Sequence, residues 1–297
     1  MLDGALLAGQ VFNGFSVASL FVLAALGLAL SFGLMRVINM AHGEMLMLGG
    51  YLAYLTYLIV PGPLAILVAM PVAFLGAALL GGILEITVIR KLSARPLDTL
   101  LATWGVSLIL QQGARSIFGP IGVGVTAPDW LNTGFTLAGV YFPSTRIFIL
   151  AVAVIVLVAL GLLIARTRLG LLVRAVNQDR MMAAASGINV RRVDLAVFCL
   201  GTGIAGLAGV VLSLLGPVTP SVGQSYIIPA FLVVVMGGLG SMVGTTIAAI
   251  ILGLVSALSQ IFVDVSMSQV LMLLAVILFL QFRPQGVIAT RSRALED

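Results

Sequence analysis

The stretch that decides the fold is RTRLGLLVRAVNQDRMMAAASGINVRRVD, residues 166–194, a long polar segment that lies between apolar runs. It is too polar to span a bilayer and too regularly patterned to be a plain loop. We expect a helix from Gly170 to Ser186, ended by Gly187 and followed by Asn189 as the cap of the next helix. One side of the helix is expected to carry its apolar residues: Val173, Val176, Met181 and Ala184. The segment therefore reads as an amphipathic helix held between two membrane spans.

The composition of the whole chain agrees with a membrane protein. Hydrophobic residues make up 61% of the 297 positions, charged residues only 8%, and the mean hydropathy is +1.23. A soluble domain carries about a quarter charged residues. The apolar runs are continuous, which favours helices over the alternating strands of a membrane barrel. The predicted fold class is therefore an all-α polytopic membrane protein, with residues 1–297 forming a single transmembrane domain.

Apolar windows predict about 8–10 transmembrane helices. The nine windows are 11–33, 41–60, 64–89, 98–118, 146–165, 194–216, 227–240, 241–262 and 268–282. The window 227–240 is short and ends in MGGLGS, so it is also consistent with a re-entrant half-helix. This division leaves a long external loop at 119–145 and a cytoplasmic loop at 166–193.

The basic residues predict the orientation of these spans. With the N-terminus outside, every basic cluster falls on the cytoplasmic side, as the positive-inside rule requires. The clusters are Arg36; Arg90, Lys91 and Arg95; the six arginines of 166–192; and Arg283, Arg291 and Arg293. A net charge of +5 distributed in this way indicates topology and does not indicate nucleic-acid binding.

Small residues predict close packing between the helices. Gly201, Ala205 and Gly209 stand four residues apart on one helix face, a spacing that allows backbones to approach each other. The hexapeptides MLMLGG at 45–50 and VVVMGG at 233–238 also echo each other, as expected if the fold contains two repeated halves.

The chain has one histidine, His42, which stands two residues before Glu44 in the stretch NMAHGEMLMLGGYLAY, residues 39–54. One interpretation is helix entry or gating, with Asn39 as the cap and Glu44 in the favourable first turn. The alternative is contact with a solute or a proton. Neither a catalytic residue nor a metal site is expected, because the chain lacks HExxH, a nucleophile elbow and a cysteine pair.

A resemblance to a known family gives these segments a function. The core RAVNQDRMMAAASGI, residues 174–188, resembles the coupling segment of ATP-binding-cassette (ABC) importer permeases of the branched-chain amino acid type. The resemblance continues through segments in the same order along the chain: GLMRVINMAHGEMLMLGGYLAY at 33–54, GTGIAGLAG at 201–209, VVVMGGLGSMVGT at 233–245 and QFRPQG at 281–286. Within this family, residues 95–119 and 128–135 resemble the urea-permease branch.

The resemblance implies a permease subunit that imports urea by alternating access, with branched-chain amino acids as the alternative substrate. A less favoured alternative for the class of protein is a proton-coupled secondary transporter. It implies a bacterial inner membrane, two cytoplasmic ABC ATPase subunits, a second homologous permease subunit and a periplasmic binding protein. The chain itself would be no enzyme and hold no cofactor. Its one lysine, Lys91, follows Arg90, so a P-loop is absent and ATP would bind to the partner ATPases.

The resemblance also implies two sets of functional residues. The set for ATPase coupling is Arg174, Ala175, Asp179, Ala184, Gly187 and Ile188. The set for the substrate pathway is Gln111, Gln112, Trp104, His42 and Glu44. Amide side chains and an indole face complement a small neutral substrate such as urea, whereas a glutamine in a membrane helix can equally serve as a hydrogen-bond link to another helix.

Overall fold

The computed structural model describes residues 4–93, 95–137 and 139–288 and is almost entirely helical. The helices before the external loop are α1 (Gly4–Met35), α2 (His42–Ile59), α3 (Ala65–Leu84), the π-helix η1 (Glu85–Ile89), α4 (Arg90–Leu92) and α5 (Pro96–Phe118). Those after it are α6 (Ser144–Arg166), α7 (Arg168–Gln178), α8 (Arg180–Ala185), α9 (Val190–Ser213), α10 (Val222–Gly237), α11 (Met242–Ser259) and α12 (Val265–Phe282). The predicted all-α fold class is confirmed.

Each of the nine predicted windows coincides with one helix, or with α3 and η1 together. Among the described residues, six helical segments are long and apolar enough to cross a membrane: Leu6–Met35, Ala65–Leu92, Ser144–Arg166, Val190–Ser213, Met242–Ser259 and Val265–Phe282. The chain is therefore a multi-pass membrane protein. The three other windows correspond to α10, which has only 16 residues, and to α2 and α5, which carry more polar side chains.

The loop 119–145, which was predicted to be external, contains a small β-hairpin that was not predicted. Strands β1 (Gly134–Leu137) and β2 (Val140–Pro143) pair antiparallel, with Phe135 opposite Phe142. The indole Nε1 of Trp130 donates to the carbonyl oxygen of Pro63 over 2.9 Å, which links this loop to the α2–α3 connection. Arg291 and Arg293, assigned to the cytoplasmic side above, lie outside the described residues.

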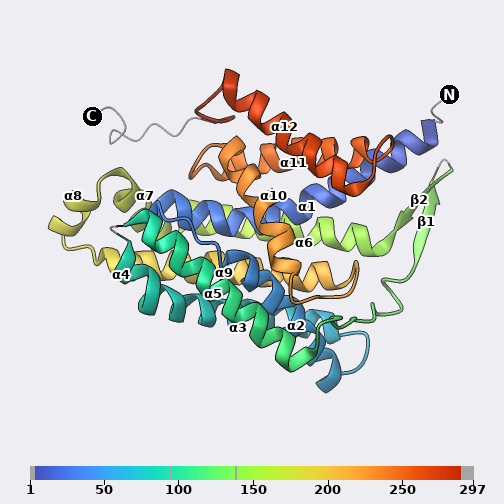
Figure 1. Cartoon of the computed structure of the whole chain (residues 1–297), viewed down its shortest axis with the longest axis horizontal. Coiled ribbons are helices and arrows are strands. Elements are labelled where there is room, and N and C mark those ends of the chain that lie inside the picture. The colour runs from blue at the N-terminus through green and yellow to red at the C-terminus, as the bar shows by residue number, and fades with distance from the viewer. Residues whose placement is uncertain (1–3, 94, 138, 289–297) are drawn as a thin grey trace.

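The helices pack in two halves that follow a common pattern. Taking α1–α5 and α9–α12 as the halves, the long helix of each packs against the other half: α1 against α11 and α10, and α9 against α3 and α2, while α1 also contacts α9 and α2 contacts α10. α1 and α9 run in opposite directions along the long axis of the molecule (Figure 1). The halves α1–α5 and α9–α12 therefore have an inverted arrangement, which is common among transporters.

Glycines meet between the halves, and the glycines of the two echoing hexapeptides lie at different places in their helices. Gly27 of α1 contacts Gly201 of α9, where a methyl carbon on Gly27 would lie 2.8 Å from the carbonyl carbon of Gly201. Gly49 lies in the middle of α2 and contacts Gly206 of α9, whereas Gly237 ends α10. The hexapeptides are therefore not equivalent positions, although the prediction that small residues allow close packing is confirmed.

The segment 166–194, which was predicted to be cytoplasmic, forms two helices, not the single helix that was predicted. Asp179 adopts an extended conformation and its Oδ1 accepts hydrogen bonds from the backbone N–H groups of Met181 and Met182, both over 2.9 Å, so it ends α7 and caps α8. This break changes the helical phase. Met181 and Ala184 are therefore exposed, and Ala183 is buried together with Val176.

The predicted ends of this segment are correct. Gly187 has a φ of +85°, the left-handed conformation of a residue that follows a helix, and its N–H donates to the carbonyl of Ala184 over 3.0 Å. The side chain of Asn189 accepts a hydrogen bond from the N–H of Arg192 over 3.2 Å and so caps α9.

Candidate functional site

Two helices begin inside the bundle, and their first turns touch. A methyl carbon added to Gly43 of α2 would lie 2.8 Å from the carbonyl carbon of Gly223 in α10, and one added to Gly223 would lie 2.6 Å from the carbonyl oxygen of Gly43. α10 runs steeply across the long helices (Figure 1). The N-terminal ends of both helices, which carry partial positive charge, therefore converge within the protein.

His42 shows how deep this meeting point lies. A hydrogen bond of 3.1 Å joins its Nε2 to the carbonyl oxygen of Ala24 in α1. Ala24 lies 11 residues before the end of α1 at Met35, which corresponds to about 16 Å along the helix axis. The segment 36–41 thus returns into the bundle before α2 begins. α2 therefore begins inside the protein, as does α10, whose window 227–240 was predicted to be consistent with a re-entrant half-helix.

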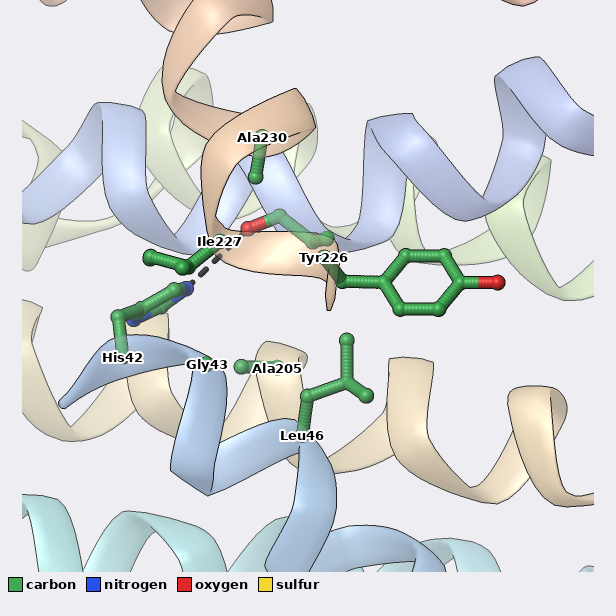
Figure 2. Close-up of a pocket in the computed structure, with 8 residues that line it drawn as sticks. His42, Gly43, Leu46, Ala205, Tyr226, Ile227 and Ala230 are labelled. Carbon is green, nitrogen blue, oxygen red and sulfur yellow. Dashed lines mark hydrogen bonds between the residues drawn. The ribbon is translucent and has the colours of Figure 1, made fainter. Parts of the chain in front are cut away.

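The surroundings of His42 are tightly packed. Figure 2 shows its imidazole beside Ile227, with Ala205, Tyr226 and Ala230 around the same gap. This gap has no room for a water molecule. His42 is therefore a buried link between α2 and α1, which fits the helix-entry interpretation.

Asn39 does not cap α2 as predicted. Its Oδ1 accepts a hydrogen bond from the N–H of Ala41 over 3.0 Å, two residues further along the chain. Ala41 is the residue that precedes α2, and no side chain caps this helix. The short polar side chain instead stabilises the turn of the re-entrant segment, which competes with capping.

Glu44 forms a buried polar cluster with α5. Its Oε1 accepts hydrogen bonds from Ser107 Oγ and from Gln111 Nε2, both over 2.8 Å, and Gln111 Nε2 also lies 3.1 Å from Ser107 Oγ. All three side chains are buried. Ser107 was missed by the sequence analysis, although it lies one turn from Gln111 and so shares a helix face with it.

The second carboxylate oxygen of Glu44 has no hydrogen-bond partner among the described residues. It lies against the first turn of α10, because a methyl carbon on Gly223 would be 2.9 Å from Oε2. Glu44 therefore contributes a carboxylate at the place where the two helix N-termini converge, and their dipoles favour its negative charge.

The other two predicted pathway residues do not join this cluster. Gln112 and Trp104 are exposed, whereas Gln111 faces Glu44. The structure therefore brings together Glu44 and Gln111, places His42 on another side of α2, and leaves Trp104 and Gln112 on an outer surface.

The segment 166–194, which was predicted to couple to an ATPase and is called the coupling segment below, is attached to the bundle by Arg180. Its Nη2 donates to Asp194 Oδ2 in α9 over 2.5 Å, and its Nη1 donates to the carbonyl oxygen of Leu34 in α1 over 2.9 Å. One guanidinium thus joins α8 to the last turn of α1 and to the first turns of α9. Arg174 of the predicted set donates to the carbonyl of Ile164 at the end of α6, over 2.6 Å.

The outer surface of the coupling segment carries exposed apolar side chains among its exposed arginines. Met181 is 84% exposed and Met182 is 65% exposed, and Leu171 of α7 is also exposed. Methionine is common at adaptable binding surfaces. Within the described residues, no group of three or more His, Cys, Asp or Glu side chains lies close enough to hold a metal ion.

A family profile described as "Branched-chain amino acid transport system / permease component" matches residues 10–280. The chain belongs to this family. The match includes the re-entrant segment, α5, the coupling segment and both inverted halves of the permease.

Individual relatives agree with this assignment. The permease is 29% identical to a high-affinity branched-chain amino acid transport system permease protein of Salmonella typhimurium over 94% of each chain. It is 31% identical to one of Pseudomonas aeruginosa over 94% of each chain. It is also 28% identical to a ribose import permease protein of Escherichia coli, over 82% of this chain and 75% of the relative. No solved structure matches the permease.

These comparisons support the family prediction and do not support urea as the substrate. The relatives named above are permease proteins for the transport of branched-chain amino acids or of ribose. The alternative prediction, branched-chain amino acids, therefore fits better than urea. Their bacterial sources and the six apolar helices place the permease in the bacterial inner membrane as a multi-pass protein.

Proposed function

We propose that this permease is the membrane-spanning subunit of an ABC importer for branched-chain amino acids. The observation that carries the proposal is the similarity to such permeases over 94% of the chain. Membership of this family implies that the permease works with ATPase subunits and a substrate-binding protein. Two ATPases and a second homologous permease subunit are part of the proposal, because importers of this kind work by moving two facing bundles relative to each other.

The coupling segment supplies the means of energy transfer in this proposal. An ATPase would dock on the exposed methionines of α8, and its movement would reach α1 and α9 through Arg180. The end of α1 leads within a few residues to the re-entrant segment and to the first turn of α2. A displacement at the cytoplasmic surface therefore has a short path to the place where α2 and α10 meet, and the two-state element that ATP biases is this junction.

The polar cluster is consistent with a zwitterionic substrate. An amino acid presents an ammonium and a carboxylate, so its recognition needs groups of both signs. The Glu44 carboxylate lies beside two helix N-termini. The carboxylate provides a negative partner for the ammonium, and the helix N-termini provide a positive partner for the substrate carboxylate. In this proposal Glu44 and Gln111 lie on the pathway, and His42 holds the entry of α2 in place.

The test is reconstitution of the complete importer in proteoliposomes with ATP inside. We expect uptake of labelled leucine that requires both the binding protein and ATP. Uptake of urea without uptake of leucine would overturn the assignment of substrate. Uptake that follows a pH gradient in the absence of ATPase subunits would overturn the importer class and favour a secondary transporter.

A further inference from the structure

A second cavity lies beside the re-entrant segment and shares the lining residue Ile227 with the gap at His42. Its volume is about 100 Å³, and it is lined by Leu28 of α1, by Ile38, Asn39 and Met40, and by Ile227, Ile228, Phe231 and Leu232 of α10. Leu28, Asn39 and Ile227 are buried and form its floor. Ile228 is 62% exposed and lies at its mouth.

The chemistry of the walls selects an apolar guest. Seven of the eight lining residues have aliphatic, thioether or aromatic side chains, and none is charged. Asn39 is the exception: its Oδ1 is used by Ala41, and its Nδ2 is buried without a hydrogen-bond partner among the described residues. Binding cavities for small molecules commonly combine apolar walls with a small number of polar groups.

The size of the cavity suits a short branched side chain. Liquid water occupies about 30 Å³ per molecule, so the cavity has room for about three or four heavy atoms. An aliphatic group of this size gains free energy by leaving water. Urea has a similar number of atoms but would lose most of its hydrogen bonds here, and an unpaired polar group in an apolar site is costly.

We propose that this cavity receives the branched aliphatic side chain of the transported amino acid. The inference rests on the proposed function and adds to it the site in this subunit that distinguishes one side chain from another. Discrimination between substrates would then depend on two stages, the binding protein outside the membrane and this cavity within it.

The position of the cavity also suggests how it is emptied. Ile38, Asn39 and Met40 form one wall of the cavity. This wall begins four residues after Leu34, and the carbonyl oxygen of Leu34 accepts a hydrogen bond from Arg180. Met40 N–H donates to Thr103 Oγ1 over 3.1 Å, so the same wall is attached to α5. A displacement of the coupling segment would therefore shift this wall relative to α10 and change the shape of the cavity.

The first experiment changes the mouth of the cavity in both directions in the reconstituted importer. Ile228→Phe narrows it and Ile228→Ala widens it, and uptake of leucine is measured relative to uptake of valine. One methylene in an apolar pocket changes discrimination by about 10- to 200-fold. We expect Ile228→Phe to lower the leucine-to-valine ratio at least about fivefold, and Ile228→Ala to leave the ratio equal or higher.

The matched control is Ile277→Phe on α12, which is 53% exposed and lies outside the cavity. It should leave the ratio unchanged. A ratio that stays within twofold of the unmodified importer for both Ile228 variants would overturn the side-chain site. So would an equal loss of uptake for both amino acids, because that result would assign the cavity to packing against a partner chain or a lipid.

A second measurement does not depend on transport. Ile228→Cys is made in a Cys199→Ala background and modified with a methanethiosulfonate reagent, with Ile277→Cys as the control. Leucine delivered by the binding protein should slow modification at 228 about fivefold or more, as expected when a bound side chain fills the site, and should leave position 277 unaffected. Absence of protection at 228 in an importer that transports leucine would overturn the site but leave the proposed function intact. An importer that transports no leucine would contradict the proposed function itself.

Discussion

The guanidinium of Arg180 donates to the carboxylate of Asp194 over 2.5 Å, across the junction between the coupling segment and α9. The same guanidinium reaches the carbonyl of Leu34, one of the unpaired acceptors at the end of α1. One side chain thus joins α8 both to the next helix, α9, and to α1, which is 146 residues away in the sequence.

Replacement of Arg180 by glutamine should uncouple ATP hydrolysis from transport. The variant loses charge-assisted hydrogen bonds worth about 1.5–3 kcal/mol each, so α8 can move without displacing α1. We expect leucine uptake to fall at least about tenfold while the ATPase activity of the assembly is retained. Arg192→Gln is the control, because Arg192 is exposed and outside this junction. Equal loss of hydrolysis and uptake would contradict a transmitting role for Arg180.

The two adjacent glutamines of α5 should differ in their effect on stability. Gln111→Ala leaves Glu44 with one hydrogen bond fewer inside the bundle and should lower the free energy of unfolding by about 1–3 kcal/mol. Gln112→Ala removes an exposed side chain and should change it by less than about 0.5 kcal/mol. Thermal unfolding of the detergent-purified protein measures both values. Similar results for the two variants would show that the Glu44 cluster does not hold α5 to α2.

The contact between Gly43 and Gly223 should not tolerate a side chain. Gly43→Ala places a methyl carbon 2.8 Å from a backbone carbon of α10, and neither helix end can shift without moving the other. We expect a loss of at least about 2–3 kcal/mol in the free energy of unfolding, or failure to accumulate in the membrane. Gly113→Ala in α5 provides the comparison. A methyl group there meets nothing within 4 Å, and helix propensity predicts up to about 1 kcal/mol of added stability.

The methionines of α8 should determine ATPase docking. Met181→Glu combined with Met182→Glu places two charges on the exposed face and keeps the Asp179 cap intact. Co-purification of the ATPase should fall at least about tenfold, because burying an unpaired charge is costly. Lys91→Glu, also on an exposed cytoplasmic residue, should have little effect. Normal recovery of ATPase with the double variant would place the docking surface elsewhere on the chain.

The positions of the helices could be predicted from the sequence because lipid requires long apolar segments; each of the nine windows lies on a helix, and six of these are long and apolar enough to cross a membrane. The break at Asp179 could not be predicted with the same rules. An aspartate within a helical pattern is compatible with an uninterrupted helix. Here its side chain competes with the backbone for the N–H groups and caps a new helix instead. Hydrophobic periodicity then assigned Met181 to the wrong face.

The candidate site could likewise be predicted only in part from the sequence. Glu44 was predicted from its position to lie in the first turn of α2, and it does. The partnership of Glu44 with Ser107 depends on how α5 lies against α2, which no local pattern specifies. The cavity at Asn39 likewise exists only because the segment 36–41 returns into the bundle beside α10.

α6 makes the inversion of the two halves possible. Each half contains four helices and brings the chain back to the side from which it started, so two such halves joined directly would have the same orientation. α6 makes few contacts with the bundle besides those with α1, α7 and the hairpin, yet it crosses the membrane once between the halves. Because it crosses once, α6 gives the second half the opposite orientation to the first, so the two halves face each other with opposed polarity.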